Sequence, residues 1–287
     1  MNESKKRFVT AVILINICMA GFIAAVLEQV VHEGTHAVFA LLAGAKINWF
    51  NLFAVSWTGE VSPLEKILIS GSAALVNIFC GIFGVYMLTR NTWQPLPITR
   101  LIVLYFTAVS FLAGFGYLFI DPIVFRPGMT LTDGTGDWTT IIAFLGGGLL
   151  IRLIIFTFGV AGLFGTFKWL AHSAMQFNTI SSARAGRFFS GLPILAVPYL
   201  VICVVFSLLA VWHPLGTTGT TIVLFKYWFG YSGFLVALLF MVTWPQITPA
   251  VQDPLKLRRT ISVPLIIATI AGVILAVVLL LPGNPAI

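Results

Sequence analysis

The chain has 287 residues, of which 59% are hydrophobic and only 9% are charged. Soluble domains carry about 25% charged residues, so this composition excludes a soluble globular protein, and no polar stretch is long enough to form a separate soluble domain. The net charge of +7 does not indicate nucleic-acid binding, because the basic residues lie in short segments between apolar runs. We therefore expect an all-α polytopic membrane protein that has the lipid bilayer, and no nucleic acid, as a partner.

The first apolar segment, residues 8–44, is too long for a simple crossing. At about 1.5 Å per residue a helix over this range would measure roughly 50 Å or more, whereas the hydrocarbon core is about 30 Å thick. Two interpretations are open: one tilted or broken helix that projects past the membrane, or two spans. Residues 1–7, which include three basic residues, and the apolar run after them resemble a signal sequence, and because the run continues without a break we expect an uncleaved signal anchor.

The same segment contains His32-Glu33-Gly34-Thr35-His36, which has the pattern H-E-x-x-H. On a helix His32 and His36 lie one turn apart on the same face, where two imidazoles can hold one Zn²⁺ ion, and Glu33 beside them can act as a general base. The alternative is a pair of interfacial histidines capped by a glutamate, without a metal. Titratable groups inside a membrane segment are costly and usually functional, which favours the zinc site.

Residues 45–62 differ from the apolar runs on either side. They are rich in β-branched and aromatic residues, interrupted by Asn48, Asn51 and Ser56. This pattern predicts one or two strands in the outer interface, although an ordinary amphipathic loop is also compatible with it. A strand there would offer an exposed edge that could pair with an extended peptide.

Six further apolar runs follow, at roughly 64–89, 98–120, 139–166, 190–212, 222–244 and 261–282. If the first segment crosses once from a cytosolic N-terminus, only Lys46, Lys66 and Arg126 lie on the outer side. Eleven basic residues then lie on the inner side: Lys5, Lys6, Arg7, Arg90, Arg100, Lys168, Arg184, Arg187, Lys256, Arg258 and Arg259. The positive-inside rule therefore favours about seven transmembrane helices in the cell (plasma) membrane, with the N-terminus inside and the C-terminus outside.

The second run contains a stretch of small residues, 70–77, that ends in Asn77. Small residues let helices approach closely, and a polar amide in an apolar helix needs a partner. Two roles for Asn77 are open: a contact between helices, or a function beside the metal site.

The third run ends at Asp121, and a polar connection with Asp133 and Asp137 follows. In the seven-span topology this connection lies on the outer side, level with the two histidines. Catalytic zinc usually takes three protein ligands, and a carboxylate is a common third. Asp137 also precedes an apolar run, where it could be a helix N-cap.

The later runs carry few polar groups. Arg152 lies near mid-depth and must find an acid, a carbonyl or water, with Glu28 one possible partner. Lys226 lies near an outer end, where it can extend to the interface, and His213 is expected to be interfacial rather than a ligand. Residues 167–189 are basic and amphipathic, which predicts a loop on the inner membrane surface.

These features resemble the site-2 protease family of intramembrane zinc metalloproteases. The match consists of H-E-x-x-H in the first long apolar segment, the small-residue stretch that ends in Asn77, and an aspartate downstream. The family has a proline where this chain has Ser72, and Thr132 separates Leu131 from Asp133. The resemblance covers roughly residues 25–145.

The resemblance implies zinc on His32 and His36, Glu33 as the general base, and Asn77 as a substrate-binding residue. It also implies an aspartate as third ligand, with Asp137 preferred over Asp133 and then Asp121. Residues 1–166 would form the metalloprotease-like core, 167–189 the amphipathic inner loop, and 190–287 three additional transmembrane helices.

The function expected from the sequence is thus a zinc metalloendopeptidase that cleaves membrane-protein or peptide substrates. The first alternative is a non-proteolytic metal-binding membrane protein, such as a binding or regulatory subunit on the same scaffold. The second is a small-solute or ion carrier that uses Arg152 and Lys226, although the sequence shows no inverted half-repeat.

Overall fold

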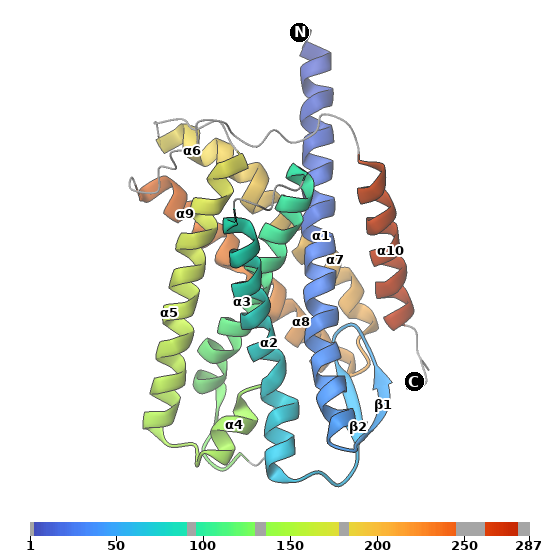
Figure 1. Cartoon of the computed structure of the whole chain (residues 1–287), viewed down its shortest axis with the longest axis vertical. Coiled ribbons are helices and arrows are strands. Elements are labelled where there is room, and N and C mark those ends of the chain that lie inside the picture. Colours follow the sequence, from blue (N-terminus) through green and yellow to red (C-terminus); the bar gives the residue numbers. More distant parts are fainter. Residues whose placement is uncertain (1–2, 91–95, 130–135, 178–183, 245–261, 281–287) are drawn as a thin grey trace.

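The computed structural model describes residues 3–90, 96–129, 136–177, 184–244 and 262–280 (Figure 1). Within these ranges, seven helical stretches are long and apolar enough to cross a membrane: Thr10–Leu42, Pro63–Thr89, Pro97–Val124, Leu149–Phe177, Ala185–Trp212, Gly216–Thr243 and Val263–Leu280. The chain is an integral multi-pass membrane protein. The predicted all-α fold with about seven spans and a small β element is confirmed.

The first apolar segment forms one unbroken helix, α1 (Glu3–Leu42), so it crosses once rather than twice. The helix ends at Leu42, and Gly44, two residues later, has a φ of +77°. In this left-handed conformation the N–H of Gly44 bonds to the carbonyl of Leu41, and the N–H of Ala45 bonds to that of Ala40. Glycine adopts such a φ without steric cost, which explains why the helix stops there.

A hairpin of two antiparallel strands follows, β1 (Lys46–Phe50) and β2 (Val55–Thr58). The pairing is irregular between Ile47 and Trp49, and Asn48 lies at this point. The Asn48 side chain bonds to the hydroxyl groups of Ser56 and Thr58 across the hairpin. The expected β element is therefore present, and it packs against the C-terminal end of α1.

Helices α2 (Pro63–Thr89) and α3 (Pro97–Val124) pack against each other and against α1. Helix α2 begins with a capping box in which Ser62 and Glu65 bond to each other's backbone N–H, and Pro63 occupies its first turn. In Figure 1, α1 lies between α2 and α3 on one side and α10 (Val263–Leu280) on the other. This central place brings the H-E-x-x-H motif into contact with several other elements.

The fourth span begins ten residues later than predicted, at Leu149 instead of 139. Residues 139–144 form a separate short helix, α4 (Thr139–Phe144), and Gly146 and Gly147 then adopt φ values of +87° and +66°. Two consecutive left-handed residues turn the chain before α5 (Leu149–Ala174) begins. Hydrophobicity alone did not reveal this turn, because the residues on both sides of it are apolar.

The predicted inner loop 167–189 is largely helical where it is described. Helix α5 continues to Ala174, a 3₁₀ turn covers Met175–Phe177, and α6 (Arg184–Gly191) follows residues 178–183, which lie outside the described ranges. The fifth span continues through a π-helical turn (Leu192–Ala196) into α7 (Val197–Leu209). The sixth consists of α8 (Gly216–Trp228), the 3₁₀ turn Gly230–Ser232 and α9 (Gly233–Thr243).

The contact between α3 and α5 generates a prediction about stability. A Cβ atom at Gly159 of α5 would lie 2.5 Å from the backbone nitrogen of Phe119, whereas a Cβ at Gly165 of the same helix would meet nothing within 4 Å. Gly159→Ala should therefore separate the two helices and lower the free energy of unfolding by about 1–3 kcal/mol. A thermal melt of the detergent-solubilised protein measures this change.

The control is Gly165→Ala, which should leave Tm unchanged or raise it slightly, because alanine favours a helix more than glycine does. Equal Tm values for the two variants would show that α3 and α5 do not pack as closely as described.

Candidate metal centre

One face of α1 carries a ladder of polar side chains in the membrane-spanning region. Glu28, Gln29, His32, Glu33 and His36 follow one another at three- and four-residue spacings, so all lie on adjacent turns of the same face. The first four are at most 5% exposed, and the side chain of His36 is 15% exposed. The motif is therefore buried inside the helix bundle and accessible only near His36.

Asp137 reaches this face from the connection between α3 and α4. Asp121, in the last turn of α3, accepts a hydrogen bond from the backbone N–H of Trp138 at 2.7 Å. Gly136 lies directly against Asp121, and a Cβ atom there would be 2.5 Å from its Oδ1. Asp121 thus bonds to one neighbour of Asp137 and packs against the other, and the Asp137 carboxyl group faces the histidines of α1.

The result is a cluster of three potential metal ligands. Asp137 Oδ2 lies 3.4 Å from His32 Nε2, and Asp137 Oδ1 lies 3.4 Å from His36 Nε2. One ligand atom from each of the three residues lies within 4.8 Å of the others, and no second group of this kind occurs among the described residues. Of the aspartates that the sequence offered as a third ligand, Asp137 is thus the one that lies beside the two histidines.

The spacing fits a tetrahedral ion. Two bonds of about 2.0–2.1 Å at a tetrahedral angle place their ligand atoms about 3.3–3.4 Å apart. Each histidine nitrogen lies at about this distance from one Asp137 oxygen, His32 from Oδ2 and His36 from Oδ1. Asp137 Oδ2 is also buried without a hydrogen-bond partner among the described residues, as expected of an atom whose partner is a cation.

Both imidazoles are held through the nitrogen that faces away from Asp137. His36 Nδ1 lies 2.6 Å from the carbonyl oxygen of Ile69 in α2, and His32 Nδ1 lies 3.0 Å from Nδ2 of Asn77. The His32 ring also stacks on Tyr117 of α3, with 5.3 Å between the ring centroids. Such contacts fix the orientation of a metal-binding histidine and leave Nε2 free to bind an ion.

Asn77 is completely buried, and its Oδ1 has no partner among the described residues. A neutral His32 that binds a metal through Nε2 carries its hydrogen on Nδ1 and requires an acceptor there. Rotation of the Asn77 amide would present Oδ1 to that hydrogen, and it would break the hydrogen bond that Nδ2 donates to Glu28. A contact of Asn77 with substrate stays a prediction; the described contacts give it a supporting role behind His32.

Glu33 is oriented by a chain of hydrogen bonds that begins in the sixth span. Lys226 Nζ and the Tyr227 hydroxyl donate to Gln29 Oε1 at 2.7 and 2.9 Å. The amide orientation of Gln29 is thereby fixed, and its Nε2 donates to Glu33 Oε1 at 2.9 Å. Because an amide nitrogen only donates, this oxygen of Glu33 must be an acceptor.

Glu28 accepts hydrogen bonds from Asn77 and from the hydroxyl group of Tyr231, and it lies 3.6 Å from Lys226 Nζ. The expectation that Lys226 extends to the interface is therefore wrong: its side chain is 15% exposed and pairs with α1. Glu28 is likewise not the partner of Arg152. The Arg152 guanidinium donates to the carbonyl of Pro122 at 2.8 Å and lies over the ring of Phe125.

The other candidate residues lie apart from the cluster. Asp133 falls outside the described residues. Asp121 anchors α4 and does not belong to the group of possible ligands, while Asp137 is not the N-cap of α4, since Trp138 occupies that position. His213 stacks on Phe53 and accepts a hydrogen bond from the N–H of Leu215, and burial lowers the pKa of its imidazole.

Sequence reasoning missed most of the residues that support the site: Glu28, Gln29, Tyr117, Tyr227 and Tyr231. The first two carried a usable signal, because each lies four residues before a residue of the motif and is polar within an apolar run. The tyrosines carried none, since aromatic residues are common throughout this chain.

Comparison with family models finds no match, and comparisons with characterised proteins and with solved structures find no similar chain. The class of protein is therefore defined by the fold and the site alone. It is a polytopic membrane protein with a buried cluster of two histidines and an aspartate beside a glutamate.

The support that Asn77 gives to His32 can be tested through metal affinity. Asn77→Leu should lower the affinity for Zn²⁺ about 10–100-fold, because His32 loses the partner of its Nδ1. Competition with a chelator of known affinity, in detergent, measures the change.

Thr107→Val is the matched control, since it also removes a buried polar group, one whose Oγ1 has no partner among the described residues. It should leave the zinc affinity unchanged. If Asn77→Leu binds zinc as tightly as the unmodified protein, the supporting role is incorrect.

Proposed function

We propose that this protein is a membrane-embedded zinc metalloendopeptidase. The observation that carries the proposal is the arrival of Asp137, a hundred residues distant in sequence, at 3.4 Å from both histidines of an H-E-x-x-H helix. A purely structural pair of buried histidines would not require a carboxyl group at the spacing of a metal's ligands. His32, His36 and Asp137 would hold the ion.

When bound, the zinc ion would supply a Lewis acid that polarises the scissile carbonyl group and makes water more acidic. Glu33 lies next to His32 in the sequence and accepts a hydrogen bond from Gln29 through one carboxyl oxygen. It is the residue that can take a proton from the attacking water and pass it to the leaving amine. The partial exposure of His36 and Asp137 gives water and substrate a way to reach the site.

The proposed substrates are membrane-associated or transmembrane polypeptides, because the cluster lies on membrane-spanning helices. A helical substrate must become extended before a peptide bond can be cut. The hairpin is a sheet of two strands, so each strand has an edge that its partner does not occupy. The hairpin also shares an apolar cluster with Ala37 and Ile69, which are near His36, so a substrate strand paired to it would lie close to the site.

The proposed location is the plasma membrane, with the N-terminus inside and the metal cluster in the outer half. The charge count of the loops supports this orientation. In Figure 1 the N-terminal end of α1 lies at one end of the molecule, and α4 and the hairpin lie at the other. The residues that complete the site thus belong to the half opposite the basic N-terminal segment.

A second candidate function is a metal-binding subunit without peptidase activity. The low exposure of the cluster favours it: His32 is 1% exposed, and the Asp137 side chain is 11% exposed. A site closed this far would bind a metal stably yet admit little substrate.

The test combines zinc content with cleavage. The purified full chain should bind one zinc ion, His36→Ala and Asp137→Ala should lose it, and Glu33→Gln should keep it while cleavage of apolar, Lys-flanked peptides falls at least about 100-fold. Elemental analysis and mass spectrometry of the peptides provide the two measurements.

His172→Ala is the control for the histidine change, because His172 lies in the last turn of α5 and takes no part in the cluster. It should retain both zinc and activity. Zinc binding without cleavage of any peptide would refute the peptidase and favour the metal-binding subunit, and absence of zinc would refute both.

A further inference from the structure

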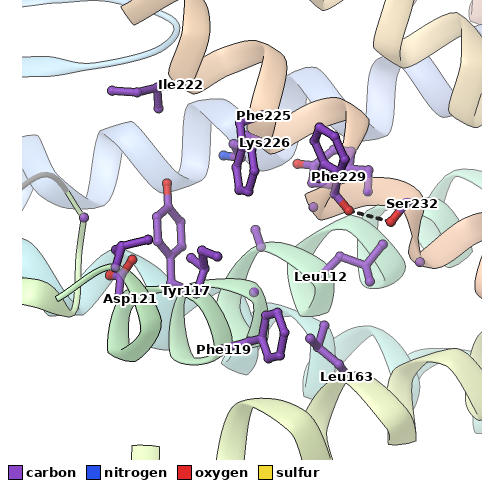
Figure 2. A pocket seen from close by; sticks show the side chains of 18 of the residues that line it. Leu112, Tyr117, Phe119, Asp121, Leu163, Ile222, Phe225, Lys226, Phe229 and Ser232 are labelled. Carbon is purple, nitrogen blue, oxygen red and sulfur yellow. Dashed lines mark hydrogen bonds between the residues drawn. The ribbon is translucent and has the colours of Figure 1, made fainter. Parts of the chain in front are cut away.

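A cavity of about 720 Å³ lies beside the metal cluster, between α3, α5, α8 and the start of α9 (Figure 2). Most of its walls are aliphatic and aromatic. Leu112 and Phe119 of α3 form part of them, together with Leu163 of α5 and Phe225 and Phe229 from the sixth span. The volume is within the range of about 300–1,000 Å³ that is typical of ligand pockets.

The titratable side chains of the cavity all connect it to the metal cluster. Tyr117 stacks on His32, Asp121 holds the backbone next to Asp137, Lys226 bonds to Gln29, and Tyr231 bonds to Glu28. Figure 2 shows Tyr117 projecting from α3, with Asp121 beside it and Lys226 of α8 opposite. The cavity therefore adjoins the cluster across a single layer of side chains, and the rest of its wall is apolar.

The cavity opens toward the lipid. Phe164, Phe225 and Phe229 line it and are also 48%, 48% and 67% exposed on membrane-spanning segments. An occupant that enters here must be apolar on the side facing away from the cluster and must present a polar group to it. A residue in a membrane-embedded polypeptide meets both requirements, because an apolar side chain and a backbone carbonyl group are adjacent in it.

We infer that this cavity is the specificity pocket of the proposed peptidase, and that it accepts a large apolar side chain next to the scissile bond. The inference rests on the proposed function and extends it: the sixth span, for which the family resemblance offers no counterpart, builds one wall of the substrate site. Large side chains such as Phe and Leu would be preferred over Ala, because they bury more apolar surface in the cavity.

Two glycines allow the pocket to be filled without disturbing the fold. Gly116 in α3 and Gly230 in the turn after α8 both line the cavity, and a Cβ atom at either position meets nothing within 4 Å. A leucine at Gly116 would thus extend into the cavity. Gly165 in α5 is the matched control, since its Cβ position is equally unobstructed but it does not line the cavity.

The experiment uses the zinc-loaded full chain in detergent and a set of Lys-flanked Ala/Leu peptides with Phe, Leu or Ala at one variable position. The measured quantity is the ratio of kcat/KM for the Phe peptide to that for the Ala peptide. Gly116→Leu should lower this ratio about tenfold or more, and Gly230→Leu should lower it as well, whereas Gly165→Leu should not change it. In a Glu33→Gln background, Gly116→Leu should likewise weaken binding of the Phe peptide about tenfold relative to the Ala peptide.

The binding measurement separates this inference from the proposed function, because it needs no cleavage. If no peptide is cleaved but the binding preference for Phe is lost in Gly116→Leu, the proposed peptidase function is refuted, while the cavity is supported as the binding pocket for an apolar side chain. If peptides are cleaved and the Phe/Ala ratio is the same in Gly116→Leu and Gly165→Leu, the pocket inference fails. Loss of a co-purifying lipid from Gly116→Leu, with an unchanged ratio, would also overturn it, because the cavity would then be a lipid site.

Discussion

The structure depends on satisfying the polar groups of α1 inside a membrane. Water is absent from the hydrocarbon region, so each buried polar side chain must find its partner within the protein. Glu28, Gln29, His32 and His36 find theirs on α2, on the α3–α4 connection and on α8, while Glu33 bonds to Gln29 of α1 itself. These contacts fix how far each of these elements is shifted along α1. Apolar packing between helices would not specify these positions, because its energy is nearly the same however far one helix is shifted along the other.

The same constraint connects the two halves of the chain. The family resemblance would divide it into a metalloprotease-like core, residues 1–166, and three additional helices, residues 190–287. Physically, however, Lys226, Tyr227 and Tyr231 all bond to α1, and α7 and α10 also pack on that helix. The division therefore describes the extent of a sequence resemblance. Removing Lys226 would leave the Glu28 carboxyl group buried without its cationic partner. A change of this kind commonly costs about 3–5 kcal/mol of stability, so the sixth span contributes to the integrity of the centre.

Much of this arrangement could be predicted from the sequence, and the failures have specific causes. The spans, the hairpin and the histidine pair follow from hydrophobicity, β propensity and helical spacing, which are local properties. The sequence supported a preference for Asp137 over Asp133 and Asp121 but no firm assignment. The direction of the Asp137 side chain depends on a tertiary contact, that of Asp121 with Trp138. The start of the fourth span was wrong because two consecutive glycines turn an otherwise apolar stretch. Lys226 was misassigned because its partners, Glu28 and Gln29, are about two hundred residues away in sequence.

The sixth span contributes residues that orient the cluster and also line the cavity. Lys226 lines the cavity and also fixes the amide of Gln29, which donates to Glu33. Tyr231 likewise lines the cavity and bonds to Glu28, which shares the amide of Asn77 with His32. A side chain that fills the cavity would therefore contact the residues that orient Glu33 and His32, the proposed general base and one proposed metal ligand. In the proposed peptidase, binding of the correct side chain would then stabilise the catalytic geometry as well as hold the substrate, which is the condition under which binding energy raises the rate of the chemical step.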